Sequence, residues 1–121
     1  MRAMMSEPFR VTTESKAERD LRIITARGAI TYNSSPLLMD AVMAASERRL
    51  IIDMREVPSV DSMAVGALVR AYVHCQKSGK GLALVGLTQR VRNVLQLTCI
   101  DPLFDTYASL AEAEVELAKY S

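Results

Sequence analysis

The sequence predicts a single α/β domain with a mixed, mostly parallel sheet of four to five strands and about four helices. Its 121 residues fit one domain of common size. Short apolar runs of strand length alternate with amphipathic segments, and the connections between them are short. Such alternation favours parallel strands, because right-handed crossovers place the helices against the sheet. We expect residues 9–121 to form this domain and residues 1–8 a flexible N-terminus.

The N-terminal part is typical of a hairpin followed by a helix. Apolar and polar residues partly alternate over 9–13, segment 21–26 is rich in β-branched residues, and segment 15–20 between them is polar. A loop rich in helix-capping residues follows at 31–36, and Pro36 suits the first turn of a helix. The apolar stripe of this helix consists of Leu37, Leu38, Ala41, Val42 and Ala45.

Three loops of the predicted fold are expected to share one face. The remaining elements are a buried strand at 50–54, a helix at 62–77 ended by Gly79, a strand at 82–85, a helix from residue 89, an extended piece near Tyr107 and a last helix capped by Ser109. Ligands of parallel sheets usually bind beyond the carboxyl ends of the strands. Function is therefore expected at loops 28–36, 57–62 and 86–89.

Composition argues against several partners. The net charge is +1, from 15 basic and 14 acidic residues, and 5% of the residues are aromatic. Nucleic-acid binding usually needs a basic stripe or aromatic stacking platforms, so no nucleic-acid partner is expected. No apolar run approaches the ~20 residues that span a bilayer, and the first nine residues contain no apolar signal core. We expect no direct membrane insertion and a cytoplasmic location.

No catalytic or metal-binding set stands out. Cys75 and Cys99 have no metal-type spacing, and His74, the single histidine, lies within a predicted helix without a catalytic partner in view. The stretch Gly79-Lys80-Gly81 precedes a strand and lacks the Lys-Ser/Thr pair of a phosphate loop. The sequence therefore predicts no enzyme, no cofactor and no metal site.

The pair Asp61-Ser62 lies where a strand meets a helix, and two interpretations remain open for it. A side-chain oxygen at this place commonly accepts a hydrogen bond from a free amide of the first helical turn. A phosphate on Ser62 would also be favoured there, because it would face exposed amides and the positive end of the helix dipole. The two interpretations are compatible.

A set of short motifs occurs in a fixed order along segment 50–104. They are the apolar strand with Asp53, Val60-Asp61-Ser62, Gly66-Ala67-Leu68, the Gly-x-x-Leu-x-Leu-Val run at 79–85, and Val91-Arg92-x-Val94-Leu95 followed by Leu103-Phe104. Residues 104–113 (FDTYASLAEA) continue this series of motifs toward the C-terminus. In this order and spacing the chain, from about residue 9 to residue 117, resembles the STAS domain of anti-sigma factor antagonists and sulphate transporters.

The resemblance implies a switch made of binding events. In the antagonist branch, a kinase that doubles as an anti-sigma factor phosphorylates the serine after the aspartate, which is Ser62 here. The unmodified antagonist occupies the kinase and frees the sigma factor, and a phosphatase resets it. The resemblance thus implies a protein partner of this kind and no cofactor. The expected partner-binding residues are Thr31, Asn33, Ser59, Asp61, Met63 and Ala64.

Two places depart from the pattern that the family commonly shows. Where relatives read Asp-Ser-Ser/Thr-Gly, this chain has Asp61-Ser62-Met63-Ala64, and where they often read Gly-Glu-Leu-Asp, it has Gly28-Ala29-Ile30-Thr31. Three hypotheses follow: an antagonist switched at Ser62, a constitutive structural subunit of a transporter or signalling complex, and a small nucleotide-binding enzyme. The last is the weakest, because the chain has no glycine-rich loop or catalytic base. The oligomeric state is left open.

Overall fold

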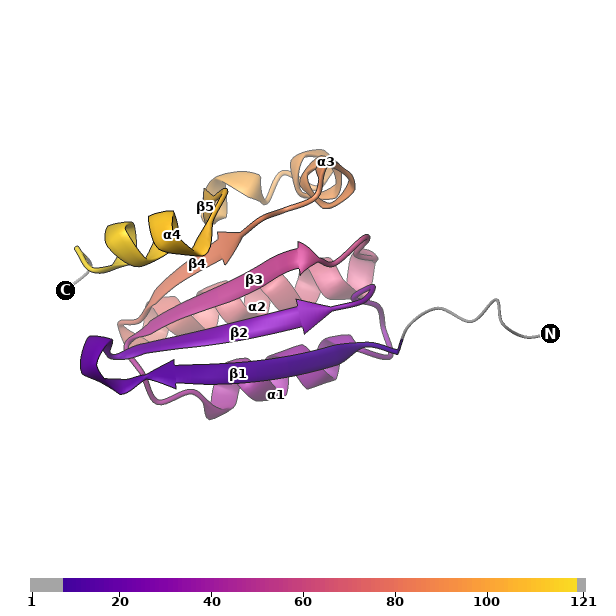
Figure 1. The fold of residues 1–121 in the computed structure, drawn as a ribbon. Helices are drawn as coiled ribbons and strands as arrows, with labels where there is room; N and C mark the ends of the chain where they lie inside the picture. The colour runs from indigo at the N-terminus through magenta and orange to yellow at the C-terminus, as the bar shows by residue number, and fades with distance from the viewer. Residues whose placement is uncertain (1–7, 120–121) are drawn as a thin grey trace.

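The computed structural model describes residues 8–119, which form five strands and four α-helices (Figure 1). The strands are β1 (Arg10–Lys16), β2 (Leu21–Arg27), β3 (Arg49–Glu56), β4 (Gly81–Val85) and β5 (Asp105–Tyr107). The helices are α1 (Ser35–Ala44), α2 (Ser62–Ser78), α3 (Gln89–Leu97) and α4 (Leu110–Leu117), with short 3-10 turns at Ala17–Arg19 and Asp101–Leu103. Apart from Pro8, the expected flexible N-terminus lies outside the described residues.

The predicted fold class is confirmed. The strands lie in the order β1-β2-β3-β4-β5; β1 is antiparallel to β2, and every other pair is parallel. The predicted element order is also confirmed, with boundaries that shift by a few residues. The largest shift concerns β1, which reaches Lys16 because Ser15 and Lys16 still pair with Arg22 and Leu21. No helix among residues 8–119 is both long and apolar enough to span a membrane.

Two apolar layers cover the sheet, and β3 contributes to both. Helices α1 and α2 lie behind the sheet in Figure 1, and α4 lies in front of it. Because successive strand residues point to opposite faces, Leu50 and Ile52 pack in the α1–α2 layer and Ile51 packs in the α4 layer. Burial on both faces explains why this strand is a continuous apolar run in the sequence.

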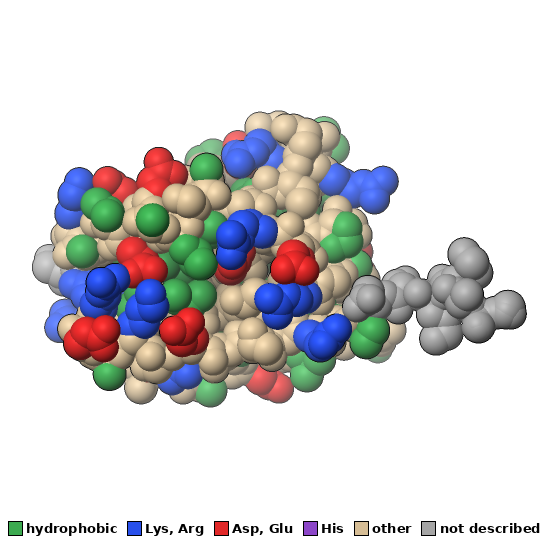
Figure 2. Space-filling model, viewed as in Figure 1, with side chains coloured by type: hydrophobic (Ala, Val, Ile, Leu, Met, Phe, Trp, Pro, Cys, Tyr) green, Lys and Arg blue, Asp and Glu red, His purple; other side chains and the backbone are tan. Residues whose placement is uncertain are grey.

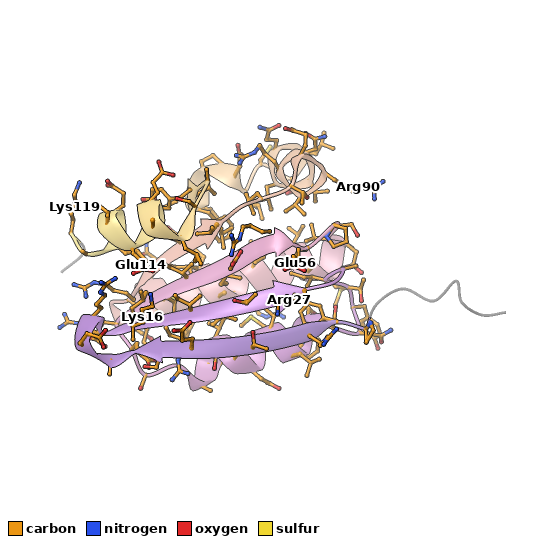
Figure 3. All side chains as sticks on the ribbon, viewed as in Figure 1. Lys16, Arg27, Glu56, Arg90, Glu114 and Lys119 are labelled. Carbon is orange, nitrogen blue, oxygen red and sulfur yellow. The ribbon has the colours of Figure 1, made fainter. Side chains whose placement is uncertain are left out.

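Helix α4 leaves the β1–β2 side of its face uncovered, and charged side chains lie there (Figure 2). Lys16 on β1 lies 3.2 Å from Glu114 on α4, which also pairs with Arg19 (Figure 3). Farther along this face, the buried Asp53 is held by Arg55 through contacts of 2.7–3.2 Å. These pairs connect α4 to the hairpin and neutralise the buried carboxylate.

A buried carboxylate connects the hairpin to the loop before β3. Glu47 accepts hydrogen bonds from Ser15 at 2.6 Å and from Arg22 at 2.9 and 3.0 Å. Burial raises the pKa of Glu47, but the hydrogen bonds from Arg22 and Ser15 outweigh that effect and lower it from 4.5 to about 2. The carboxylate therefore stabilises the fold above about pH 4.5, and this contribution is lost as the pH falls toward 2.

Glu47→Gln is expected to lower the free energy of unfolding at pH 7 by about 1–3 kcal/mol, because a charged acceptor of two partners is removed. The difference between the two proteins should shrink as the pH falls below about 4.5 and disappear near pH 2. Urea unfolding at a series of pH values measures this. A difference that is as large at pH 2 as at pH 7 would show that the ionised carboxylate does not stabilise the fold.

Candidate functional site

The loops after β2 and β3 are joined beyond the carboxyl ends of their strands. Ile30 and Val60 form an isolated parallel bridge. The Ile30 amide donates to the Ser59 carbonyl at 3.0 Å, and the Asp61 amide donates to the Ile30 carbonyl at 3.1 Å. Two connections far apart in the sequence therefore form one continuous surface, as expected for parallel strands.

Asp61 holds this surface through both oxygens of its carboxylate. Oδ1 accepts from the Ala64 amide at 2.9 Å, and Oδ2 accepts from the Tyr32 amide at 3.0 Å. The first bond caps α2, and the second fixes the loop after β2 against the helix. The cap interpretation of the Asp61-Ser62 pair is thus confirmed for Asp61, and the clamp on Tyr32 adds a role that local sequence does not reveal.

Ser62 is the first residue of α2 and is exposed. Its hydroxyl makes no hydrogen bond with any other described residue. Two apolar side chains lie nearby: Tyr32 in the loop after β2, which is 67% exposed, and Met63 in the first turn of α2, which is 50% exposed. Ser62 is therefore an accessible hydroxyl with apolar neighbours, an arrangement suited to a protein contact. The exposed side chains of Ser62, Tyr32 and Met63 are called the Ser62 surface below.

The loop after β2 is shaped by Ser34, which the sequence analysis did not single out. This nearly buried side chain accepts from the Thr31 amide at 2.7 Å and donates to the Ala29 carbonyl at 3.0 Å. Thr31 Oγ1 in turn accepts from the Asn33 backbone amide at 3.3 Å, and the Asn33 side chain is exposed. The run of capping residues at 31–36 indicated that side chains would bond to the loop backbone, but which side chain pairs with which backbone group depends on the folded loop.

Ala64 requires a correction among the expected partner-binding residues. Its side chain is fully buried in the core layer of α2, because position 64 lies on the helix face that packs against the sheet. In this structure the side chain cannot touch a partner. Thr31, Asn33, Asp61 and Met63 border the Ser62 surface or hold it in place, and their role in binding stays a prediction.

Ser59 faces a neighbouring hollow instead. This hollow of about 730 Å³ lies beyond the ends of β2 and β3, and its lining includes Arg27, Glu56 and Arg90. Arg27 Nε lies 3.1 Å from Glu56 Oε2, and Arg90 stands in the first turn of α3 (Figure 3). Thr88, the cap of α3, is 3.4 Å from the Val57 carbonyl. The third predicted loop therefore adjoins the other two.

The described part of the chain offers few other groups for metal binding or nucleophilic chemistry. Within residues 8–119, no three side chains of His, Cys, Asp or Glu come close enough together to hold a metal ion. Cys75 is buried, and desolvation raises the pKa of its thiol, which keeps it protonated. The site combines an exposed hydroxyl, a fixed carboxylate and apolar neighbours, which together can bind a protein and carry a modification.

Asp61→Ala is expected to destabilise the domain by about 1–2 kcal/mol and to speed hydrogen exchange at the Tyr32 amide, because the cap and the clamp are both lost. Asp61→Asn is the matched control. Its single carbonyl oxygen can keep the cap, and its NH₂ group cannot accept from Tyr32. Urea unfolding and amide exchange measure the two effects. Equal stability of Asp61→Ala and the unaltered protein would contradict the assigned role.

Comparison with known proteins agrees with this geometry. A family model described as "STAS domain" matches residues 12–113. A Thermotoga maritima protein named "Putative anti-sigma factor antagonist" is 27% identical over 82 residues, which cover 68% of this chain and 73% of the relative.

Two solved structures share the fold. An anti-sigma factor antagonist from Mycobacterium paratuberculosis superposes with a TM-score of 0.81 at 24% identity, covering 93% of this chain and 98% of that one. The Bacillus cell fate determinant SpoIIAA, solved in its phosphorylated form, gives a TM-score of 0.69 at 16% identity, covering 88% and 98%. Since the family model also spans most of the residues that build the sheet, the helices and the Ser62 surface, this chain belongs to the STAS domain family.

Proposed function

We propose that this protein is an anti-sigma factor antagonist or a close relative, a cytoplasmic protein-binding module that is switched by phosphorylation of Ser62. The observation that carries the proposal is the position of Ser62. It is an exposed hydroxyl at the start of α2, on a surface that Asp61 fixes in place. The named relatives support the same role, because the Thermotoga and Mycobacterium proteins are assigned as anti-sigma factor antagonists.

The partner would be a serine kinase that also acts as an anti-sigma factor. In the unmodified state, Tyr32 and Met63 supply apolar contact area, and the small Ser62 side chain lets the partner approach. Because hydrogen bonds already fix the loop after β2, docking would cost little further ordering of this segment. A phosphatase would restore the binding-competent form.

Phosphorylation would weaken docking through charge. A phosphoryl group brings an additional charge of about −1.5 to −2 next to the Asp61 carboxylate. Both Asp61 oxygens already accept backbone amides, so the Ala64 amide is not available to the new group. Burying such an unpaired anion at an interface would cost about 4 kcal/mol, or roughly a thousandfold in Kd. No backbone movement is needed.

A constitutive structural subunit is the second candidate function, and one observation favours it. Met63 stands beside Ser62 with half of its side chain exposed, and it gives a partner an apolar contact that needs no kinase. In such an assembly Ser62 would serve as the first residue of α2 only, and binding would not respond to its charge.

The test compares tagged unaltered protein, Ser62→Ala, Ser62→Asp and the matched control Ser46→Asp. Ser46 is also exposed but lies in the loop before β3, away from the Ser62 surface. Each protein is passed through lysate of the native host, and bound proteins are identified by mass spectrometry. A kinase-like anti-sigma factor should be recovered with all variants except Ser62→Asp.

The partner recovered in this way is then titrated against the unmodified and the Ser62-phosphorylated protein. The proposal expects a Kd weakened roughly a thousandfold by the phosphoryl group. Recovery of one partner with all four proteins and equal affinity of both forms would remove the switch. If that partner were a transporter ATPase, the structural-subunit function would replace it.

A further inference from the structure

A furrow of about 660 Å³ runs between α1 and α2, on the helical layer behind the sheet in Figure 1. Its apolar lining includes Met39 and Met43 from α1 and Val69 and Val73 from α2. Each pair is four residues apart, so each forms a stripe along its helix. The two stripes face each other across the furrow.

Met39 packs partly against the core, but Met43 and Val73 lie outside it. On α1 the core positions are Leu38 and Val42, which are 1% and 0% exposed. Met43 is 56% exposed and Val73 is 40% exposed, although both are apolar. Apolar side chains that gather in a furrow and stay accessible indicate a contact surface, and methionine adapts well to a partner's shape.

Charged residues border the furrow asymmetrically. Arg70 and Lys77 lie on the α2 side, seven residues or about two helical turns apart, and Asp40 lies on the α1 side. None of the three makes a hydrogen bond or an ion pair with another residue of segment 8–119. Arg70 reaches back along α2, and its Nη1 lies 3.7 Å from the point where a Cβ of Gly66 would be. These charges are available to a partner.

The furrow opens toward the Ser62 surface. Met63, Gly66 and Arg70 follow one another at helical spacing along the same side of α2, so the α2 wall leads to the rim of that surface. Pro36, in the first turn of α1, lines the same end of the furrow and follows the loop that Asp61 clamps. One partner could therefore contact both surfaces at once.

We propose that this furrow binds an amphipathic helix of the protein partner. The apolar stripe of that helix would pack on Met39, Met43 and Val73. Acidic side chains seven residues apart would face Arg70 and Lys77, and a basic side chain would face Asp40. The inference deepens the proposed function and rests on it, because it specifies the chemistry of the partner that binds at the Ser62 surface.

The walls of the furrow favour a helix over an extended segment. Both walls are helices whose backbone groups are bonded internally, so they offer no backbone partners to an added strand. A helical segment satisfies its own backbone groups and can pack its side chains between two helices. The 10 residues of α1 span about 15 Å, which accommodates between two and three turns.

The test uses a synthetic 18-residue helical peptide with leucines on one face, two glutamates seven residues apart on one flank and a lysine on the other. A second peptide has lysines in place of the glutamates. The full chain is labelled with ¹³C at the methionine methyl groups, and each peptide is titrated by NMR. The buried Met54 serves as an internal reference, since it lies in the core.

The proposal expects saturable shifts of the Met39 and Met43 methyl signals, with Met54 unchanged. The glutamate peptide should bind about fivefold to tenfold tighter than the lysine peptide. Arg70→Glu should remove or reverse that preference. The matched control is Arg90→Glu, which reverses another exposed helical arginine outside the furrow and should leave the preference unchanged.

Three results would overturn the proposal: unchanged Met39 and Met43 signals, equal affinity for both peptides, or equal behaviour of Arg70→Glu and Arg90→Glu. Shifts of these methyl signals with protein concentration alone would show that a second copy of the chain occupies the furrow, which also overturns it. The titration requires neither a kinase nor a modified Ser62. Its failure is therefore distinguishable from failure of the Ser62 switch.

Discussion

The carboxylate of Asp61 makes two hydrogen bonds that connect three parts of the chain. One oxygen caps α2 through the Ala64 amide, and the other holds the Tyr32 amide in the loop after β2. The loop after β3 that leads into Asp61 is fixed by a separate bridge between Ile30 and Val60. The Ser62 surface is therefore formed before any partner arrives, and it depends on one side chain that belongs to no apolar layer.

Because the surface depends on Asp61, a small chemical change at the neighbouring Ser62 could strongly change the affinity for a partner. A rigid surface that is complementary to its partner gains affinity, because little ordering is required on binding. Such a surface also cannot rearrange to pair a charge that is added to it. Both Asp61 oxygens are occupied, so a second anion next to them cannot take the Ala64 amide or the Tyr32 amide as a donor. In the proposed switch, the same hydrogen bonds that prepare the surface would make partner binding sensitive to phosphorylation of Ser62.

Local sequence patterns were sufficient for the order of the elements and for several of their ends. Alternating apolar runs marked the strands and helices, and Gly79 and Ser109 act as the helix cap residues that their positions indicate. The packing of Arg55 on β3 over Gly86, which follows β4, was not predictable. Such contacts depend on which strand neighbours which, information that a single segment does not contain.

At the site, position along the chain identified Ser62 and Asp61, but it could not separate accessible from buried neighbours. Met63 and Ala64 are adjacent in sequence, and the helical turn exposes the first while it buries the second. The position of Tyr32 near Ser62 and the furrow between α1 and α2 both arise only when separate strand–helix connections pack together. Helical periodicity predicts the face that packs on the sheet, whereas the flanks of two helices meet only in the folded domain.

In the proposed switch, the surface around Ser62 is preformed and the phosphoryl group acts on it by charge alone. This can be measured by amide hydrogen exchange at Tyr32 and Ala64, compared between the unmodified protein and the protein carrying phosphoserine at position 62. Both amides should stay protected to a similar degree, since neither hydrogen bond to Asp61 is displaced. Loss of protection at either amide would contradict this mechanism and show that phosphorylation works by rearranging the loops.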